Sequence, residues 1–284
     1  MRTTEAPSFA ATRDTPPSTA GEGLLRVARV NGRSEVLTAR ATSPMKLLTP
    51  RSSVSSDASV VMSSYGGGLV SGDRLRLRVT VGDGARLRIG TQASTKVYRR
   101  TERGGACAQT INADVAAGAT LIVAPDPVTC FAGAAYEQSQ RFHLAPDASL
   151  LLVDWLTSGR WACGERWAFE SYRSRTEISV AGRRVLLDAI RIDARHGTFD
   201  QPHRCGRFEC LATVVLIGPA FAALAERILI DVARETVQRR GLLISAASPV
   251  RGGAILRVAG MGAEPVGRYV TAHLSDVQLW DRKW

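Results

Sequence analysis

The sequence lacks the features of a membrane or secreted protein. None of its apolar runs reaches the roughly 18 residues that a membrane-spanning helix needs. The N-terminal segment, residues 1–22, has no apolar stretch of the kind found in secretory signals, and its Thr, Ser, Pro and Ala content predicts a disordered tail. The five cysteines are odd in number and widely scattered, which argues against a disulfide framework. We therefore expect a cytoplasmic protein in a reducing compartment, with no membrane partner.

Common catalytic and nucleotide-binding motifs are also missing. The sequence contains no Gly-x-Ser-x-Gly and no Gly-Lys-Ser/Thr, and neither Ser158 nor Cys163 has a base nearby in sequence. The stretch GGGLVSGDRLRLRV, residues 66–79, is rich in glycine, but a dinucleotide site needs a helix after such glycines and here a strand pattern follows. This stretch instead predicts a bulged turn where two backbones approach closely. We expect neither enzymatic activity nor a tightly bound cofactor.

Aromatic residues make up only 6% of the 284 residues, against 45% hydrophobic residues overall, so the core should consist mainly of Val, Leu, Ile and Ala. Lys and Arg number 37 against 26 Asp and Glu, which gives a formal net charge of +11. Such a charge favours an acidic partner, whether nucleic acid, an anionic membrane or an acidic protein surface. Because the arginines are spread along the chain, they are more typical of solvated strand faces than of a nucleic-acid-binding stripe.

From about Gly23 to Phe208 the dominant period of hydrophobic residues is two, which indicates β-strands. The alternating runs LRLRVTV and ARLRI flank Gly82-Asp83-Gly84, so we predict an antiparallel hairpin there. A weak repeat places Ala85, Ala119 and Ala148 after similar turns and before apolar strands. We predict a mostly β fold, an elongated scaffold of stacked β-hairpins or a superhelical β scaffold, with a plain sandwich as the alternative.

Further segments follow the same patterns. The predicted strands are 109–115, 137–144, 166–174, 176–180, 183–192, 208–217, 242–248 and 253–260. Helical periodicity appears in residues 219–240, with Pro219 in the first turn and Gly241 as the C-terminal cap, and again in about 264–280. We therefore expect a single β-rich domain at residues 23–284 that ends in two helices.

Two sets of residues are candidates for metal contact. His196, His203, Cys205 and Cys210 occur within a short window, but their spacing matches no zinc pattern and is typical of a surface loop. Carboxylates also occur within otherwise apolar or basic strands. These are Asp73, Asp126, Asp154, Glu165, Asp188 and Asp193. Each either pairs with an arginine or lines a polar interior through which cations pass.

Several blocks, in order along the chain, resemble the urease accessory proteins of the UreD (UreH) family. They are SPMKLLTP (43–50), SSYGGGLVSGDRLRLRVTVGDGARLRIGTQASTKVYR (63–99), PDPVTCFAGAAYEQSQRF (125–142), VDWLTSGRWACGERWAF (153–169) and the ending LWDRKW. The block at 63–99 is the longest and the most specific. The tail to about Glu22 and the segment HGTFDQPHRC have no counterpart in this resemblance.

The resemblance implies a non-enzymatic urease maturation factor with a β-rich superhelical scaffold. Such a protein binds apo-urease and a UreF-type accessory protein, and through the complex a UreG-type GTPase, and supports nickel delivery to the urease active site. It holds nickel only transiently, in an internal water-filled passage, and we expect no nucleic acid partner. The alternative, based on the positive charge, is a basic β-rich nucleic-acid-binding protein, although stacking aromatics are scarce.

A passage for nickel needs oxygen or imidazole groups that bind weakly and reversibly, because a tight site would trap the ion. The hypothesis assigns this role to Asp73, Thr91, Gln92 and Glu165, which lie within the resembling blocks. The alternative for each is a structural hydrogen bond at a turn.

Overall fold

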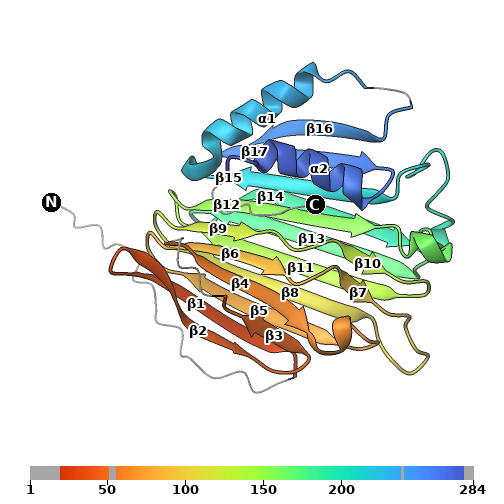
Figure 1. The fold of residues 1–284 in the computed structure, drawn as a ribbon, viewed down its shortest axis with the longest axis horizontal. Helices are drawn as coiled ribbons and strands as arrows, with labels where there is room; N and C mark the ends of the chain where they lie inside the picture. The colour runs from red at the N-terminus through yellow and green to blue at the C-terminus, as the bar shows by residue number, and fades with distance from the viewer. Residues whose placement is uncertain (1–19, 51–55, 238–239, 278–284) are drawn as a thin grey trace.

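The computed structural model describes residues 20–50, 56–237 and 240–277, and the protein in this region is built on two large β-sheets (Figure 1). The seven-stranded sheet contains, in spatial order, β14 (Arg183–Asp193), β13 (Ser171–Val180), β11 (Ala135–Leu144), β8 (Cys107–Val115), β5 (Arg74–Val81), β1 (Glu22–Val30) and β2 (Arg33–Ala41). The tail predicted for residues 1–22 lies almost entirely outside the described residues, as does the ending LWDRKW.

The second sheet has ten strands. Its main path contains β16 (Leu243–Val250), β17 (Gly253–Gly260), β15 (Cys210–Ile217), β12 (Ser149–Thr157), β9 (Thr120–Val123), β6 (Arg86–Thr91), β4 (Ala58–Ser64) and β3 (Met45–Leu48). Off this path, β10 (Val128–Cys130) pairs with β12 and with β7 (Thr95–Val97). Four short 3-10 turns, Tyr65–Gly67, Trp161–Cys163, Ala194–His196 and Pro219–Phe221, lie between strands or before a helix.

The central strands alternate between the two sheets along the chain. Strands β5, β8, β11 and β13 pair as parallel neighbours in the seven-stranded sheet, while β4, β6, β9 and β12 do so in the other sheet. The hairpin predicted at Gly82–Gly84 is therefore wrong, because β5 and β6 belong to different sheets. An alternating pattern shows only that both strands turn an apolar face to the core, and strands in facing sheets meet that condition as well as paired strands do.

The alanine repeat marks the turns between the sheets. Ala85, Ala119 and Ala148 are fully or almost fully buried, and each backbone N–H donates to the carbonyl three residues earlier. Successive turns stack, since Thr120 N–H donates to Ala85 O at 2.9 Å and Ser149 N–H donates to Ala119 O at 2.9 Å. A small side chain is needed at this position because the turn packs against the next one.

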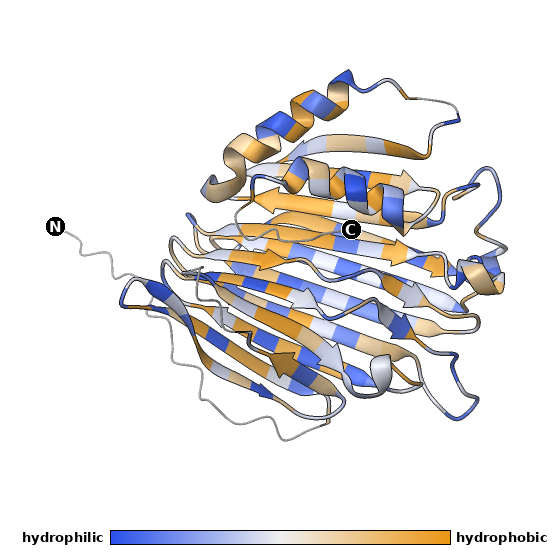
Figure 2. Cartoon of the chain, in the orientation of Figure 1, coloured by the Kyte–Doolittle hydropathy of each residue, from blue (hydrophilic) through white to orange (hydrophobic). Residues whose placement is uncertain are grey.

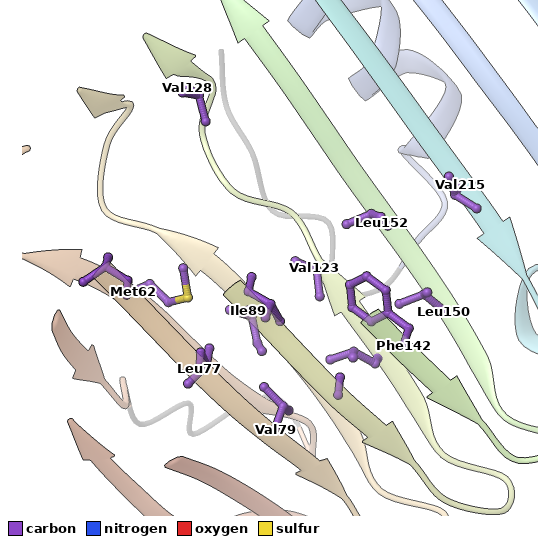
Figure 3. Close-up of a cluster of buried hydrophobic side chains, with 14 of the residues drawn as sticks. Met62, Leu77, Val79, Ile89, Val123, Val128, Phe142, Leu150, Leu152 and Val215 are labelled. Carbon is purple, nitrogen blue, oxygen red and sulfur yellow. The ribbon is translucent and has the colours of Figure 1, made fainter. Parts of the chain in front are cut away.

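The main hydrophobic core fills the space between the two sheets. Leu77, Val79 and Phe142 from the seven-stranded sheet meet Ile89 and Leu152 from the other sheet (Figure 3). Hydrophobic and hydrophilic residues alternate along most strands in Figure 2, as expected for sheets with one buried and one solvated face.

A second core lies beneath two helices, α1 (Ala222–Arg234) and α2 (Ala263–Leu274), which cover the outer face of β12, β15 and β17 (Figure 1). The mostly β fold with two C-terminal helices is thus confirmed. Helix α1 ends at Arg234, not at the predicted Gly241 cap: Glu235 has an extended backbone, and its carboxylate accepts hydrogen bonds from Ser245 and Tyr269.

The strand predicted for residues 166–174 is also partly wrong. Residues 166–170 form a loop, and a single strand, β13, runs on from Ser171 through the predicted break before Thr176. Trp167 has a positive φ of 54°, and its N–H donates to Ser158 O at 2.6 Å, which holds the chain away from the sheet.

Candidate functional site: a polar column between the sheets

A group of polar side chains crosses the otherwise apolar space between the two sheets. From the seven-stranded sheet come Gln109 on β8, Gln138 and Gln140 on β11, and Ser174 and Thr176 on β13. From the facing sheet comes Asp154 on β12. We call these six residues the polar column. They occupy the inward positions of their strands, in the same alternation that places Phe142 in the core.

Asp154 is the centre of the polar column. Its Oδ2 accepts hydrogen bonds from Gln138 Nε2 at 2.9 Å, Ser174 Oγ at 3.1 Å and Gln140 Nε2 at 3.4 Å. Burial raises the pKa of the Asp154 carboxyl, and the hydrogen bonds from Gln138 and Ser174 oppose part of this shift. The surrounding donors are neutral amides and hydroxyls, so the carboxylate is solvated by dipoles in the interior.

Tyr136 links the ends of the two neighbouring glutamines. Its hydroxyl lies 3.3 Å from Gln109 Oε1 and 3.3 Å from Gln138 Oε1, and its one proton serves one of them at a time. Burial raises the pKa of Tyr136 well above its ordinary value, so the phenol stays protonated and acts as a donor.

Two cavities adjoin the polar column. One, of about 400 Å³, opens at the surface and is lined by Thr91, Gln92, Lys96 and Gln109, among others. The other is an enclosed space of about 20 Å³, lined by Gln109, Gln138, Gln140 and Asp154, with room for about one water molecule. Gln109 lines both, as do Met62 and Thr95. The interior carboxylate is therefore separated from the surface cavity by a few side chains.

Polar residues continue beyond Asp154 toward β17 and toward β14, the end strand of the seven-stranded sheet. Thr213 on β15 lies opposite Asp154 in the sheet register, and Arg257 on β17 lies opposite Thr213. Arg257 Nη2 donates to Asp188 Oδ1 on β14 at 2.6 Å, and this contact joins the two sheets. The negative charge of Asp188 also contributes to the raised pKa of Asp154.

Two of the four residues predicted to line a nickel passage do line the surface cavity. Thr91 Oγ1 donates to Asp126 Oδ2 at 2.8 Å and accepts from Asp126 N–H at 2.6 Å. Gln92 Oε1 accepts from Ser63 Oγ at 2.9 Å. Asp126 lines the enclosed space, so the Thr91–Asp126 pair lies between the two cavities.

The other two predicted residues lie in loops away from the polar column. Asp73 Oδ2 accepts from Val70 N–H at 2.9 Å and closes the turn that follows the glycine-rich stretch. Glu165 accepts from Arg160 Nε at 3.0 Å and from Ala132 N–H at 3.1 Å. The hydrogen bond from Arg160 is the largest cause of the lowered pKa of Glu165. These contacts are structural, and a nickel role for either residue stays a prediction.

The His/Cys segment does not form a cluster. His196 and His203 are exposed, whereas Cys205 and Cys210 are buried. Burial raises the pKa of Cys205 to about 11 and that of Cys210 to about 12. Within residues 20–50, 56–237 and 240–277, no three His, Cys, Asp or Glu side chains gather where they could hold a metal ion.

Sequence reasoning missed the glutamines, Ser174 and Thr176, and included Asp154 only among several acidic candidates. The signal that could have found the glutamines was the two-residue alternation of side chains along a strand. Gln138 and Gln140 share the alternation of Tyr136, Phe142 and Leu144, so they had to face inward. That a carboxylate from the opposite sheet meets them is decided by the stacking of the two sheets.

In the part of the chain that is described, no helix is both long and apolar enough to cross a membrane.

Comparison with known proteins places the chain in a family. The family model described as UreD urease accessory protein matches residues 19–282. The urease accessory protein UreD of Sorangium cellulosum is 48% identical over 272 residues, which cover 93% of this chain and 85% of that protein. UreD of Anaeromyxobacter sp. is 44% identical, with 91% and 86% covered, and the urease accessory protein D of Arabidopsis thaliana is 37% identical, with 72% and 71% covered. The chain belongs to the UreD family of urease accessory proteins.

Proposed function

We propose that this chain is a non-enzymatic cytoplasmic maturation factor for urease, which binds apo-urease together with UreF-type and UreG-type accessory proteins and supports nickel delivery to the urease active site. Membership of the family supports the role in urease maturation. The observation that carries the nickel role is the polar column, in which Asp154 and a row of amides and hydroxyls lie between two apolar sheets beside a surface cavity.

The chemistry of the column suits a cation that must move on. Carboxylate, amide and hydroxyl oxygens bind divalent ions, and a single carboxylate with neutral neighbours holds such an ion less tightly than a set of several anionic ligands. Gln138 and Gln140 turn their Nε2 atoms toward Asp154, and Gln109 and Gln138 turn their Oε1 atoms toward the Tyr136 hydroxyl. Rotation of these amides would let a nickel ion exchange one oxygen ligand for the next.

The surface cavity would be the entrance of this nickel route. Thr91 and Gln92 lie at its wall, and the Thr91–Asp126 pair reaches the enclosed space. A hydrated ion would lose water stepwise as it passes from the cavity to Asp154. We assign Asp73 and Glu165 to the loops that hold the scaffold in shape.

The decisive experiment compares Asp154→Asn with Asp147→Asn, a matched change in the exposed turn before β12. Each variant replaces the wild-type protein in a urease-positive host. Urease nickel content is measured by metal analysis, and recovery of the accessory complex is measured by co-purification. We expect the Asp154 variant to lower nickel per urease while the complex still forms, and the Asp147 variant to behave as wild type.

Normal nickel content in the Asp154 variant would overturn the assignment of the column. The double variant Asp73→Asn with Glu165→Gln tests the earlier loop hypothesis in the same host. If it alone lowers nickel content while the complex persists, the route runs along the loops and not through the column.

A further inference from the structure

The outer face of the seven-stranded sheet gathers arginines that are scattered in the sequence. Arg74, Arg76 and Arg78 occupy successive outward positions of β5, and all three are exposed. Arg40 on β2 lies opposite Leu24 of β1, which in turn lies opposite Arg78. On the other side, Arg78 pairs with Asn112 of β8, and Asn112 pairs with Arg141 of β11. We call Arg40, Arg74, Arg76, Arg78 and Arg141 the arginine face.

These five side chains have no partner within the described ranges. No hydrogen bond or ion pair is formed by any of the five guanidinium groups among residues 20–50, 56–237 and 240–277, whereas Arg173 at the far side of the sheet pairs with Glu137 at 3.2 Å. Asn112 lies between Arg78 and Arg141, and the nearby Thr110 and Ser139 are also neutral and can form hydrogen bonds, while Glu22 and Asp114 lie at the margins of the group. The face is therefore a cationic surface with free donors.

Such an arrangement costs the isolated protein free energy. Residues two apart on a strand are about 7 Å apart, and neighbouring strands are about 5 Å apart, so like charges here repel each other. Scattered surface charges in a soluble protein are usually of mixed sign, which avoids this repulsion. Glu22 lies opposite Arg76 and offsets part of this repulsion. The arginines of the face still outnumber Glu22 and Asp114, and this excess of positive charge points to a partner that supplies the opposite charge.

Building on the proposed role in a urease-maturation complex, on which this inference rests, we propose that the arginine face is the docking surface for a carboxylate-rich face of a protein partner. Guanidinium groups form paired hydrogen bonds with carboxylates, and complementary charge speeds association and sets orientation. The face carries no aromatic side chain on β1, β5, β8 or β11, and stacking aromatics are what a single-stranded nucleic acid needs. Carboxylates also lie on the face, at Glu22 and Asp114, which suits a mixed protein surface better than a phosphate polyanion.

The test uses two triple variants of the full chain. One reverses three charges of the face, Arg74→Glu, Arg76→Glu and Arg78→Glu. The control reverses three exposed arginines elsewhere, at Arg103, Arg234 and Arg251, and changes the net charge equally. Binding to poly-L-glutamate and to duplex DNA is measured over a salt series, and co-purification of urease apoprotein and a UreF-type protein is measured in nuclease-treated extract.

We expect the face variant to bind polyglutamate at least tenfold more weakly than wild type and to lose the co-purifying proteins, while the control loses much less of both. Equal losses in both variants would mean that only net charge matters and would overturn the proposal. Tighter binding to DNA than to polyglutamate, or full recovery of the complex by the face variant, would also overturn it.

The milder triple Arg74→Gln, Arg76→Gln and Arg78→Gln separates binding from folding. The unfolding temperature of this variant should be unchanged or raised, because the substitutions remove repulsion between like charges. The variant should nevertheless fail to bind the partner. Loss of the partner in this variant can be told apart from failure of the nickel proposal. Variants of Asp154 test delivery within an intact complex, whereas variants of the arginine face test whether the complex forms.

Discussion

Replacing Asp154 should change stability in two opposite ways, depending on the new side chain. In Asp154→Ala, the Nε2 atoms of Gln138 and Gln140 lose the oxygen that they share, and each keeps only a longer contact of 3.3 or 3.4 Å to a hydroxyl. An unsatisfied buried donor costs about 1–3 kcal/mol. We therefore expect Asp154→Ala to lower the free energy of unfolding by roughly 2–4 kcal/mol.

Asp154→Asn keeps an oxygen in place to accept from Gln138 and Ser174, and it removes the buried negative charge. The pKa of Asp154 is raised in the folded protein, so above the unfolded pKa the folded chain binds more protons than the unfolded chain. Stability of the wild type therefore falls as pH rises through the folded pKa of Asp154. The asparagine variant lacks this loss, and its stability relative to wild type should increase with pH.

The assay is urea unfolding of wild type, Asp154→Asn and Asp154→Ala between about pH 4, near the unfolded pKa, and pH 8. The outcome that refutes the reasoning is an asparagine variant that becomes less stable than wild type as pH rises, since the ionised carboxylate would then be stabilised by its surroundings. Combined with a lower urease nickel content, a stable asparagine variant would show that the charge is kept for function at a cost in stability.

Three further predictions follow from the same structure. Gln140→Leu should lower urease nickel content while changing the free energy of unfolding by less than about 1.5 kcal/mol, and Gln201→Leu, in an exposed loop, should leave nickel content unchanged. Gly68→Ala should lower stability by about 1–3 kcal/mol in thermal unfolding, because its Cβ would lie 2.8 Å from Lys96 O, and Gly105→Ala, with open space, is the control. Asp193→Asn should lower the melting temperature at pH 7, because it removes the ion pair with Arg195 that lowers the pKa of Asp193. The stabilisation by this pair is present above the unfolded pKa and is lost as pH falls through the folded pKa. The difference in melting temperature between the variant and the wild type should therefore vanish in acid.

The glycine-rich stretch shows how far local sequence can lead. The absence of a helix after Gly66–Gly68 excluded a phosphate loop, and the expected close approach of two backbones is found at Gly68. The same residues do more than form a turn, because Gly67 and Gly68 line the surface cavity beside Thr91 and Gln92. Sequence placed these segments in strands and turns, but their meeting at one cavity depends on the pairing of distant strands.

Strand identity could be predicted, but strand pairing could not. Alternation in β5 and β6 correctly identified both strands and their buried faces. It could not show that the turn at Gly82–Gly84 leads to the opposite sheet, because the buried pattern is the same in both cases. The repeat of Ala85, Ala119 and Ala148 was the better guide, since it marks equivalent turns that stack.

The sequence by itself determined the class of the protein: a mostly β chain with two C-terminal helices and the family blocks of a urease accessory protein, because periodicity and motifs are local properties. Only the tertiary structure decided where chemistry is concentrated. Gln138 and Asp154 come from different sheets, and Arg78 and Arg141 come from strands that are not adjacent. Stacking of the sheets and parallel pairing of their strands bring these residues together, and both depend on contacts between segments far apart in the chain.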